Sequence, residues 1–158
     1  MTHWRMQLHP AAPGGAIKHT VESLSAGYIG LDFAEDTADL KTISQSALPE
    51  NQRHYWAFAH EMEIGDHVLL FAHNFPFALA RVSGDYNYVR EAVHELRVWF
   101  RHFRAVDSVA YYGDFHTNVR NWNSIPMPAT IMPLRDPLSE SFVIIEEWKQ
   151  RLGTAGVV

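Results

Sequence analysis

One stretch, residues 65–104, most constrains what this chain can fold into, because it reads as three strands in succession. Residues 66–72 are nearly all apolar, which is typical of a strand covered on both faces. Residues 77–82 form a second apolar run after the turn signal at 74–76. Residues 98–103 alternate with period two, as a strand with two different faces does. Successive strands of this kind predict a small barrel whose loops carry a binding site.

The flanking segments predict a mixed α+β domain. We expect strands at 3–9, 28–33 and 106–112, helices at 16–26, 49–62 and 139–152, an irregular link or short helix at 115–123, and an extended Pro-rich segment at 124–137. Gly27 supplies the stop signal of the first helix, and Gly30 inside a strand indicates a bulge or a close approach of another group to the backbone. We expect one domain over 1–152 and a flexible tail at 153–158.

Composition excludes several classes of function. The chain has no Cys, which rules out disulfides, a Cys-bound zinc and a thiol nucleophile. No metal-binding helix motif, phosphate-cradling glycine loop or nucleophile elbow is present, so we expect no catalytic residue, no metal and no cofactor. No apolar run approaches the ~20 residues of a membrane span, and the N-terminus lacks a signal pattern, so we expect a cytoplasmic protein without a membrane partner.

The charge pattern leaves room for a selective nucleic-acid reader. A net charge of -5 argues against broad, non-specific wrapping of nucleic acid. Basic residues nevertheless gather between residues 81 and 104. The residues we expect to contact phosphate are Lys18, Arg81, Arg90, Arg97 and Arg101.

Aromatic residues are the other candidate for function, since they make up 13% of the chain and many fall at strand ends or in loops. Rings in such places can stack on a planar base. Tyr86 and Tyr88 lie in an expected loop, where a core role is least natural, and Asp32 is placed to accept a hydrogen bond from an amino edge. The alternatives are that the rings close the core and that Asp32 caps a turn. The predicted pocket comprises Tyr28, Gly30, Asp32, Phe33, His73, Phe75, Phe77, Tyr86, Tyr88 and Trp99.

These segments resemble the PUA superfamily, in particular its EVE and YTH types. Residues 65–70 are similar to the Gly-Asp strand of EVE domains. Residues 85–87 resemble the Asp-Tyr segment of YTH domains, and residues 98–100 with the Val-Asp pair at 106–107 look like the next YTH strand. The Arg-Asp pair at 135–136 echoes a late pair in YTH chains.

The resemblance implies a PUA-like twisted barrel of five or six strands flanked by helices, with a pocket for a modified base flipped out of double-stranded DNA. It further implies a specificity module of a modification-dependent restriction system, with a nuclease or motor domain fused to it or in complex. YTH domains carry a Trp in their short second strand, where this chain has Tyr28-Ile29-Gly30. Methyladenine and methyl- or hydroxymethylcytosine therefore remain open as ligands.

Three other functions remain open. The main alternative is an RNA-binding or small-ligand-binding PUA-like domain. A small enzyme with a His-based acid/base site and a purely structural interaction domain are the others.

Overall fold

The computed structural model describes residues 1–8, 13–33, 37–91, 100–112, 123–126 and 129–154. Six strands in the described residues form one sheet in the order β2-β5-β4-β3-β1-β6. The strands are β1 (His3–Gln7), β2 (Tyr28–Leu31), β3 (His67–Ala72), β4 (Phe75–Tyr88), β5 (His102–Tyr111) and β6 (Ile131–Leu134). β1 runs parallel to β3, and every other neighbouring pair is antiparallel. The described helices are α1 (Ala16–Ser25), α2 (Trp56–His60) and α4 (Glu140–Thr154), with 3-10 turns at Pro13–Gly15, Gln45–Ala47 and Glu50–Tyr55.

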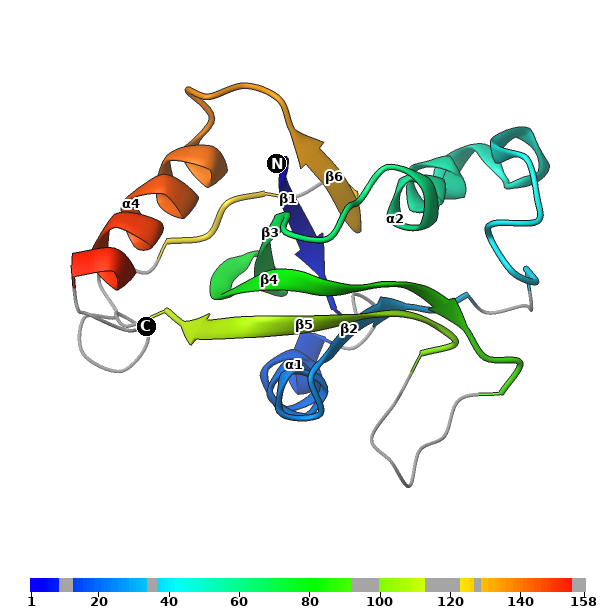
Figure 1. The fold of residues 1–158 in the computed structure, drawn as a ribbon, viewed down its shortest axis with the longest axis horizontal. Helices are drawn as coiled ribbons and strands as arrows, with labels where there is room; N and C mark the ends of the chain where they lie inside the picture. The colour runs from blue at the N-terminus through cyan, green and yellow to red at the C-terminus, as the bar shows by residue number, and fades with distance from the viewer. Residues whose placement is uncertain (9–12, 34–36, 92–99, 113–122, 127–128, 155–158) are drawn as a thin grey trace.

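The sheet curls into a half-barrel, and helices pack around it (Figure 1). α4 and α2 lie near opposite ends of the long strands β4 and β5, while α1 packs against β2 and β3 (Figure 1). The predicted mixed α+β class is therefore confirmed. None of the described helices is long and apolar enough to cross a membrane.

β3 separates two apolar cores. Val68 and Leu70 on one face join the larger core, which also contains Phe58 of α2. Leu69 and Phe71 on the other face join a smaller core under α4. Strand side chains alternate between faces, so a strand that feeds two cores must be apolar throughout. This explains the unbroken apolar run and confirms that both faces of this strand are covered.

Most predicted elements are confirmed by the structure, namely the first strand, the first helix, the short second strand and the C-terminal helix. α4 also includes residues 153–154, which we expected in the tail, and residues 155–158 lie outside the described part of the chain. The link predicted at 115–123 also falls almost wholly outside the described residues.

Two predictions about the central strands are wrong. β4 does not end at Val82 but continues to Tyr88, because the Ser-Gly-Asp signal at 83–85 produces a bulge instead of a turn. The register between β4 and β5 shifts between Val82 and Tyr86. The runs at 98–103 and 106–112 were expected to be separate strands, yet residues 102–111 form the single strand β5.

Two helices also differ from the sequence expectation. Most of the helix predicted at 49–62 is a 3-10 helix, followed by the short α2. On α1, the apolar side chains Ile17 and Val21 are exposed, and the small residues Thr20 and Ser23 are buried. Small side chains allow the helix to lie close to the strands it covers, so packing distance outweighs the apolar pattern here.

Asp66 ties the N-terminus to the central strands. Its Oδ1 accepts a hydrogen bond from the backbone N–H of Thr2 at 2.6 Å. Its Oδ2 accepts from the indole Nε1–H of Trp4 at 2.8 Å and from the backbone N–H of Glu63 at 3.0 Å. The preceding Gly65 has a φ of 96°, a left-handed conformation that favours glycine. The Gly-Asp pair therefore has a structural role: glycine makes the turn and the carboxylate fixes β1 beside β3.

We predict that Asp66→Ala lowers the free energy of unfolding by roughly 2–4 kcal/mol, because it leaves the buried indole N–H of Trp4 unsatisfied. Urea unfolding followed by circular dichroism measures the change. Glu91→Ala is the control, since Glu91 is an exposed carboxylate, and it should change the value by less than about 0.5 kcal/mol. Equal effects of the two substitutions would contradict the role of Asp66.

A polar cluster lies between α4 and the sheet. His3 Nε2 lies 2.5 Å from Glu146 Oε1, which also accepts from Lys149 Nζ at 3.0 Å. The rings of His3 and His67 meet edge to face at 5.6 Å. Burial lowers the pKa of His67 below its ordinary value of 6.5, and the nearby Lys149, His3 and Arg81 lower it further against the opposing effect of Glu146.

We predict that this cluster makes stability pH-dependent. A lowered pKa means that the folded state binds the His67 proton less readily than the unfolded chain does. Stability is therefore full above about pH 6.5 and decreases as the pH falls below that value. Urea unfolding at pH 7.5 and pH 5.5 measures the decrease, which should be smaller in His67→Gln. An unchanged decrease in that variant would remove His67 as its source.

Candidate functional site

A row of aromatic rings crosses the end of the sheet where β2, β4 and β5 meet. The register places Leu31, His102 and Tyr88 side by side on three strands. The rings follow the order Tyr55, Phe33, His102, Tyr88, with successive centroid separations of 4.9, 5.2 and 5.1 Å. Phe33 and His102 are buried, whereas Tyr55 and Tyr88 are half-buried. The two outer members of this ring row therefore keep part of their surface exposed.

Hydrogen bonds fix the centre of the ring row. His102 Nδ1 lies 2.8 Å from Tyr86 Oη, and its Nε2 lies 3.5 Å from Thr37 Oγ1. Tyr86 Oη also accepts a hydrogen bond from the backbone N–H of Leu40 at 3.0 Å. Burial raises the pKa of the Tyr86 hydroxyl well above its usual range. Tyr86 is thus a core residue that fastens residues 37–40 to the sheet, and our placement of it in a loop is wrong.

A carboxylate and a guanidinium bond the backbone of Phe33, a member of the ring row. Asp32 Oδ1 accepts from the backbone N–H of Phe33 at 2.8 Å and from Arg101 Nε at 2.7 Å. Arg101 Nη2 also donates to the carbonyl oxygen of Phe33 at 2.7 Å. Asp32 Oδ2 has no hydrogen bond in the described part of the chain. Arg101 therefore positions Asp32, and one carboxylate oxygen stays available as an acceptor.

Tyr28 and Gly30 lie on the other face of this sheet corner, opposite Tyr88. Tyr28 packs edge to face on Phe103, with centroids 5.3 Å apart. A Cβ atom at Gly30 would clash with the ring of Phe100 and with the carbonyl oxygen of His102. The close approach predicted at Gly30 is confirmed, and the group that approaches it is the protein's own Phe100.

Three further residues of the predicted pocket lie at the opposite end of β4. His73 occupies the β3–β4 hairpin turn with a φ of 58°, and Phe75 begins β4. Phe77 packs on Tyr111 at 5.6 Å. A strand of 14 residues spans roughly 40 Å at about 3.3 Å per residue, so these residues share no pocket with Tyr88. Trp99 lies outside the described residues.

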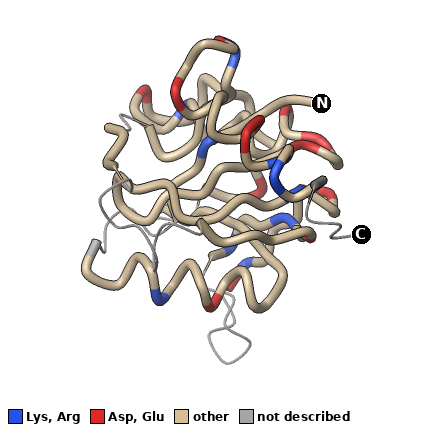
Figure 2. Tube along the Cα trace, turned by 90° about the vertical axis from the view of Figure 1, so that its left-hand side faces the viewer, with Lys and Arg blue, Asp and Glu red and all other residues tan. Residues whose placement is uncertain are grey.

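The predicted phosphate contacts are scattered. Arg81 makes a two-pronged ion pair with Asp107, with nitrogen-to-oxygen distances of 2.8 and 2.9 Å. Lys18 is exposed on α1, and Arg90 is exposed just after β4. Arg97 lies outside the described residues. Figure 2 shows Lys and Arg interspersed with Asp and Glu along the described trace, so these residues form no single basic face in that view.

Sequence reasoning missed Arg104, Tyr55 and Thr37. Arg104 is 3% exposed, and its guanidinium donates to the carbonyl oxygens of Phe58 and Ala59 in α2 and of Gly84 in the β4 bulge. A run of arginines gives no sign of which one is buried, since the register of β5 decides it.

Among the described side chains, no three His, Asp or Glu residues converge as a metal site would require.

Fold and site together define a mixed α+β domain with a curled six-stranded sheet and a ring row at one end of it. Residues 4–132 match the family model described as a domain of unknown function, DUF8426. The match covers most of the chain, which therefore belongs to this family. No curated protein matches the chain.

We predict that Tyr86→Phe lowers the free energy of unfolding by about 1–3 kcal/mol, because the Leu40 N–H and His102 Nδ1 both lose a buried partner. Tyr28→Phe is the matched control, since the Tyr28 hydroxyl has no hydrogen bond in the described structure, and its effect should stay below about 0.5 kcal/mol. Chemical denaturation of both variants measures the difference. A Tyr86→Phe protein as stable as the control would contradict the proposed anchoring of residues 37–40.

Proposed function

We propose that this domain binds double-stranded DNA and reads a modified base at the ring row. The observation that carries the proposal is the pairing of accessible rings with an unused acceptor. Tyr55 and Tyr88 are half-buried rings of the row, and Asp32, which bonds the backbone N–H of Phe33 through Oδ1, has no hydrogen bond to Oδ2 in the described residues. Stacking supplies affinity for any base, and a fixed carboxylate selects a base with an amino edge.

The free energy gained by stacking and hydrogen bonding is comparable with the cost of extruding the base from the duplex. Extrusion of a base from the duplex costs a few kcal/mol. Stacking on an aromatic side chain returns about 1–3 kcal/mol per base, and a hydrogen bond to a charged acceptor adds to it. Arg101 holds the carboxylate in place before the base arrives, which reduces the cost of ordering the site.

The finer fold identity is part of the same proposal. A helix between the first two strands, a Gly-Asp turn into a buried strand and a following antiparallel pair support a PUA-like barrel of the EVE or YTH type. In this proposal the domain supplies specificity within a cytoplasmic modification-dependent restriction system. Cleavage belongs to a nuclease or motor domain fused to it or in complex.

A small-ligand or RNA-binding function is the second candidate. The net charge of -5 and the ion pairing of Arg81 and Arg101 favour a compact ligand over a long duplex. A free nucleoside or a single-stranded RNA would require fewer phosphate contacts than duplex DNA does.

We predict that the protein binds a duplex with one modified base at least tenfold more tightly than the unmodified duplex. Fluorescence anisotropy with duplexes that contain 5-methylcytosine, 5-hydroxymethylcytosine or N6-methyladenine measures the affinities at one fixed salt concentration. Tyr88→Ala removes one stacking surface and should weaken the preferred duplex by roughly tenfold. Asp32→Asn should reduce the preference for a base with an amino edge.

Phe75→Ala is the matched control, because Phe75 is a half-buried ring at the opposite end of β4 and its loss should leave binding unchanged. Equal affinities for all duplexes would reject the modified-base function. Tighter binding of single-stranded RNA or of free nucleosides in the same assay would favour the second candidate.

A further inference from the structure

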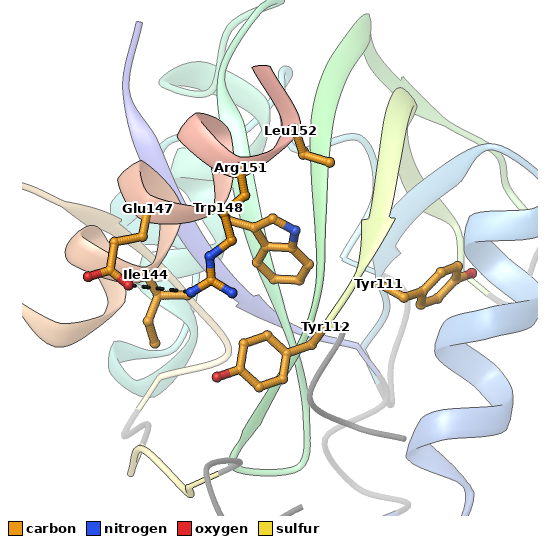
Figure 3. Close-up of a pocket in the computed structure, with 7 residues that line it drawn as sticks. All are labelled: Tyr111, Tyr112, Ile144, Glu147, Trp148, Arg151 and Leu152. Atoms are coloured by element: carbon orange, nitrogen blue, oxygen red, sulfur yellow. Dashed lines mark ion pairs between the residues drawn. The ribbon is translucent and has the colours of Figure 1, made fainter. Parts of the chain in front are cut away.

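A concave site lies far from the ring row, between the end of β5 and the face of α4 that turns toward it (Figure 3). It has a volume of about 290 Å³. Its lining includes Tyr112 after β5 and Ile144, Trp148 and Leu152 of α4. β5 extends from His102 in the ring row to Tyr111 beside this cavity, a span of roughly 30 Å at about 3.4 Å per residue. The cavity and the ring row are therefore separate sites.

The walls favour a flat, mainly apolar ligand. The rings of Tyr112 and Trp148 meet at 62° with centroids 5.5 Å apart, so they form a corner and leave no slot between them (Figure 3). A planar molecule in this corner stacks on one ring and meets the edge of the other, which is the arrangement that aromatic rings prefer. Ile144 and Leu152 add aliphatic surface. The volume equals about ten water molecules, which fits a small ligand.

The rim adds a hydrogen-bonding requirement. Glu147 and Arg151 are paired at 3.7 Å, and their side chains are 59% and 70% exposed (Figure 3). An exposed pair of this kind is weak, so both groups can turn toward a ligand. Trp148 is 8% exposed, and its indole N–H has no hydrogen bond in the described structure. The site therefore offers a carboxylate acceptor, a guanidinium donor and an indole donor.

We propose that this cavity binds a small, neutral, planar aromatic molecule with an amide-like edge. Such an edge carries a hydrogen-bond donor beside an acceptor, so it can engage Glu147 and Arg151 together. An anion attracted by Arg151 is repelled by Glu147, and a cation attracted by Glu147 is repelled by Arg151. The opposite charges of Glu147 and Arg151 thus favour a neutral ligand. This proposal is independent of base reading at the ring row.

Three probes with one ring and different edges test the proposal, namely benzamide, benzoate and benzamidinium. Each is titrated into the 158-residue protein, and the indole Nε1–H resonance of Trp148 is followed by NMR after its assignment with Trp148→Phe. We expect benzamide to shift this resonance and to bind roughly two- to fivefold more tightly than either charged probe. Absence of any shift with all three probes overturns the proposal.

Two charge substitutions sharpen the test. Glu147→Gln removes the carboxylate next to Arg151, so benzoate becomes the tightest probe, and Arg151→Gln makes benzamidinium the tightest. Both side chains are exposed, so the unfolding midpoint should stay close to that of the unaltered protein. Tyr88→Ala, at the other end of β5, should leave benzamide binding unchanged. The same order of affinities in all of these proteins overturns the selection by rim charge.

Discussion

The carboxylate of Asp66 is the interaction on which the rest of this structure depends. It joins the first residues of the chain to the turn before β3, across more than sixty residues of sequence. That link sets the parallel pairing of β1 with β3, and β3 in turn supplies apolar side chains to both cores. The backbone of Asp66 also pairs with Val82 in β4, so one residue fixes three strands at the same level of the sheet.

The sequence was informative where local chemistry and tertiary packing agree. The apolar run before Ala72, the glycine at position 30 and the amphipathic C-terminal helix predicted their elements well. It was less informative at Ser83-Gly84-Asp85, because the residues that favour a turn also favour a bulge. The pairing of β4 with β5 decides between the two, and that pairing is a long-range property that no local pattern contains.

The candidate site shows the same limit in another form. The aromatic residues Tyr88 and Phe33 were expected to line one base pocket, and the structure places both in the ring row. The presence of an aromatic residue does not indicate that Tyr28 faces the other side of the sheet or that Phe75 lies at the far end of a long strand. Likewise, the predicted phosphate contact Arg101 binds Asp32, because the register of β2 with β5 sets them opposite each other.

Arg104 has a consequence for how the two outer tyrosines behave together. Its guanidinium donates hydrogen bonds to the carbonyl oxygens of Phe58 and Ala59 in α2 and of Gly84 in the bulge of β4. Tyr55 directly precedes α2, and Tyr88 ends β4 a few residues beyond the bulge. The two tyrosines are thus held by one braced framework, so their separation is fixed when the chain folds.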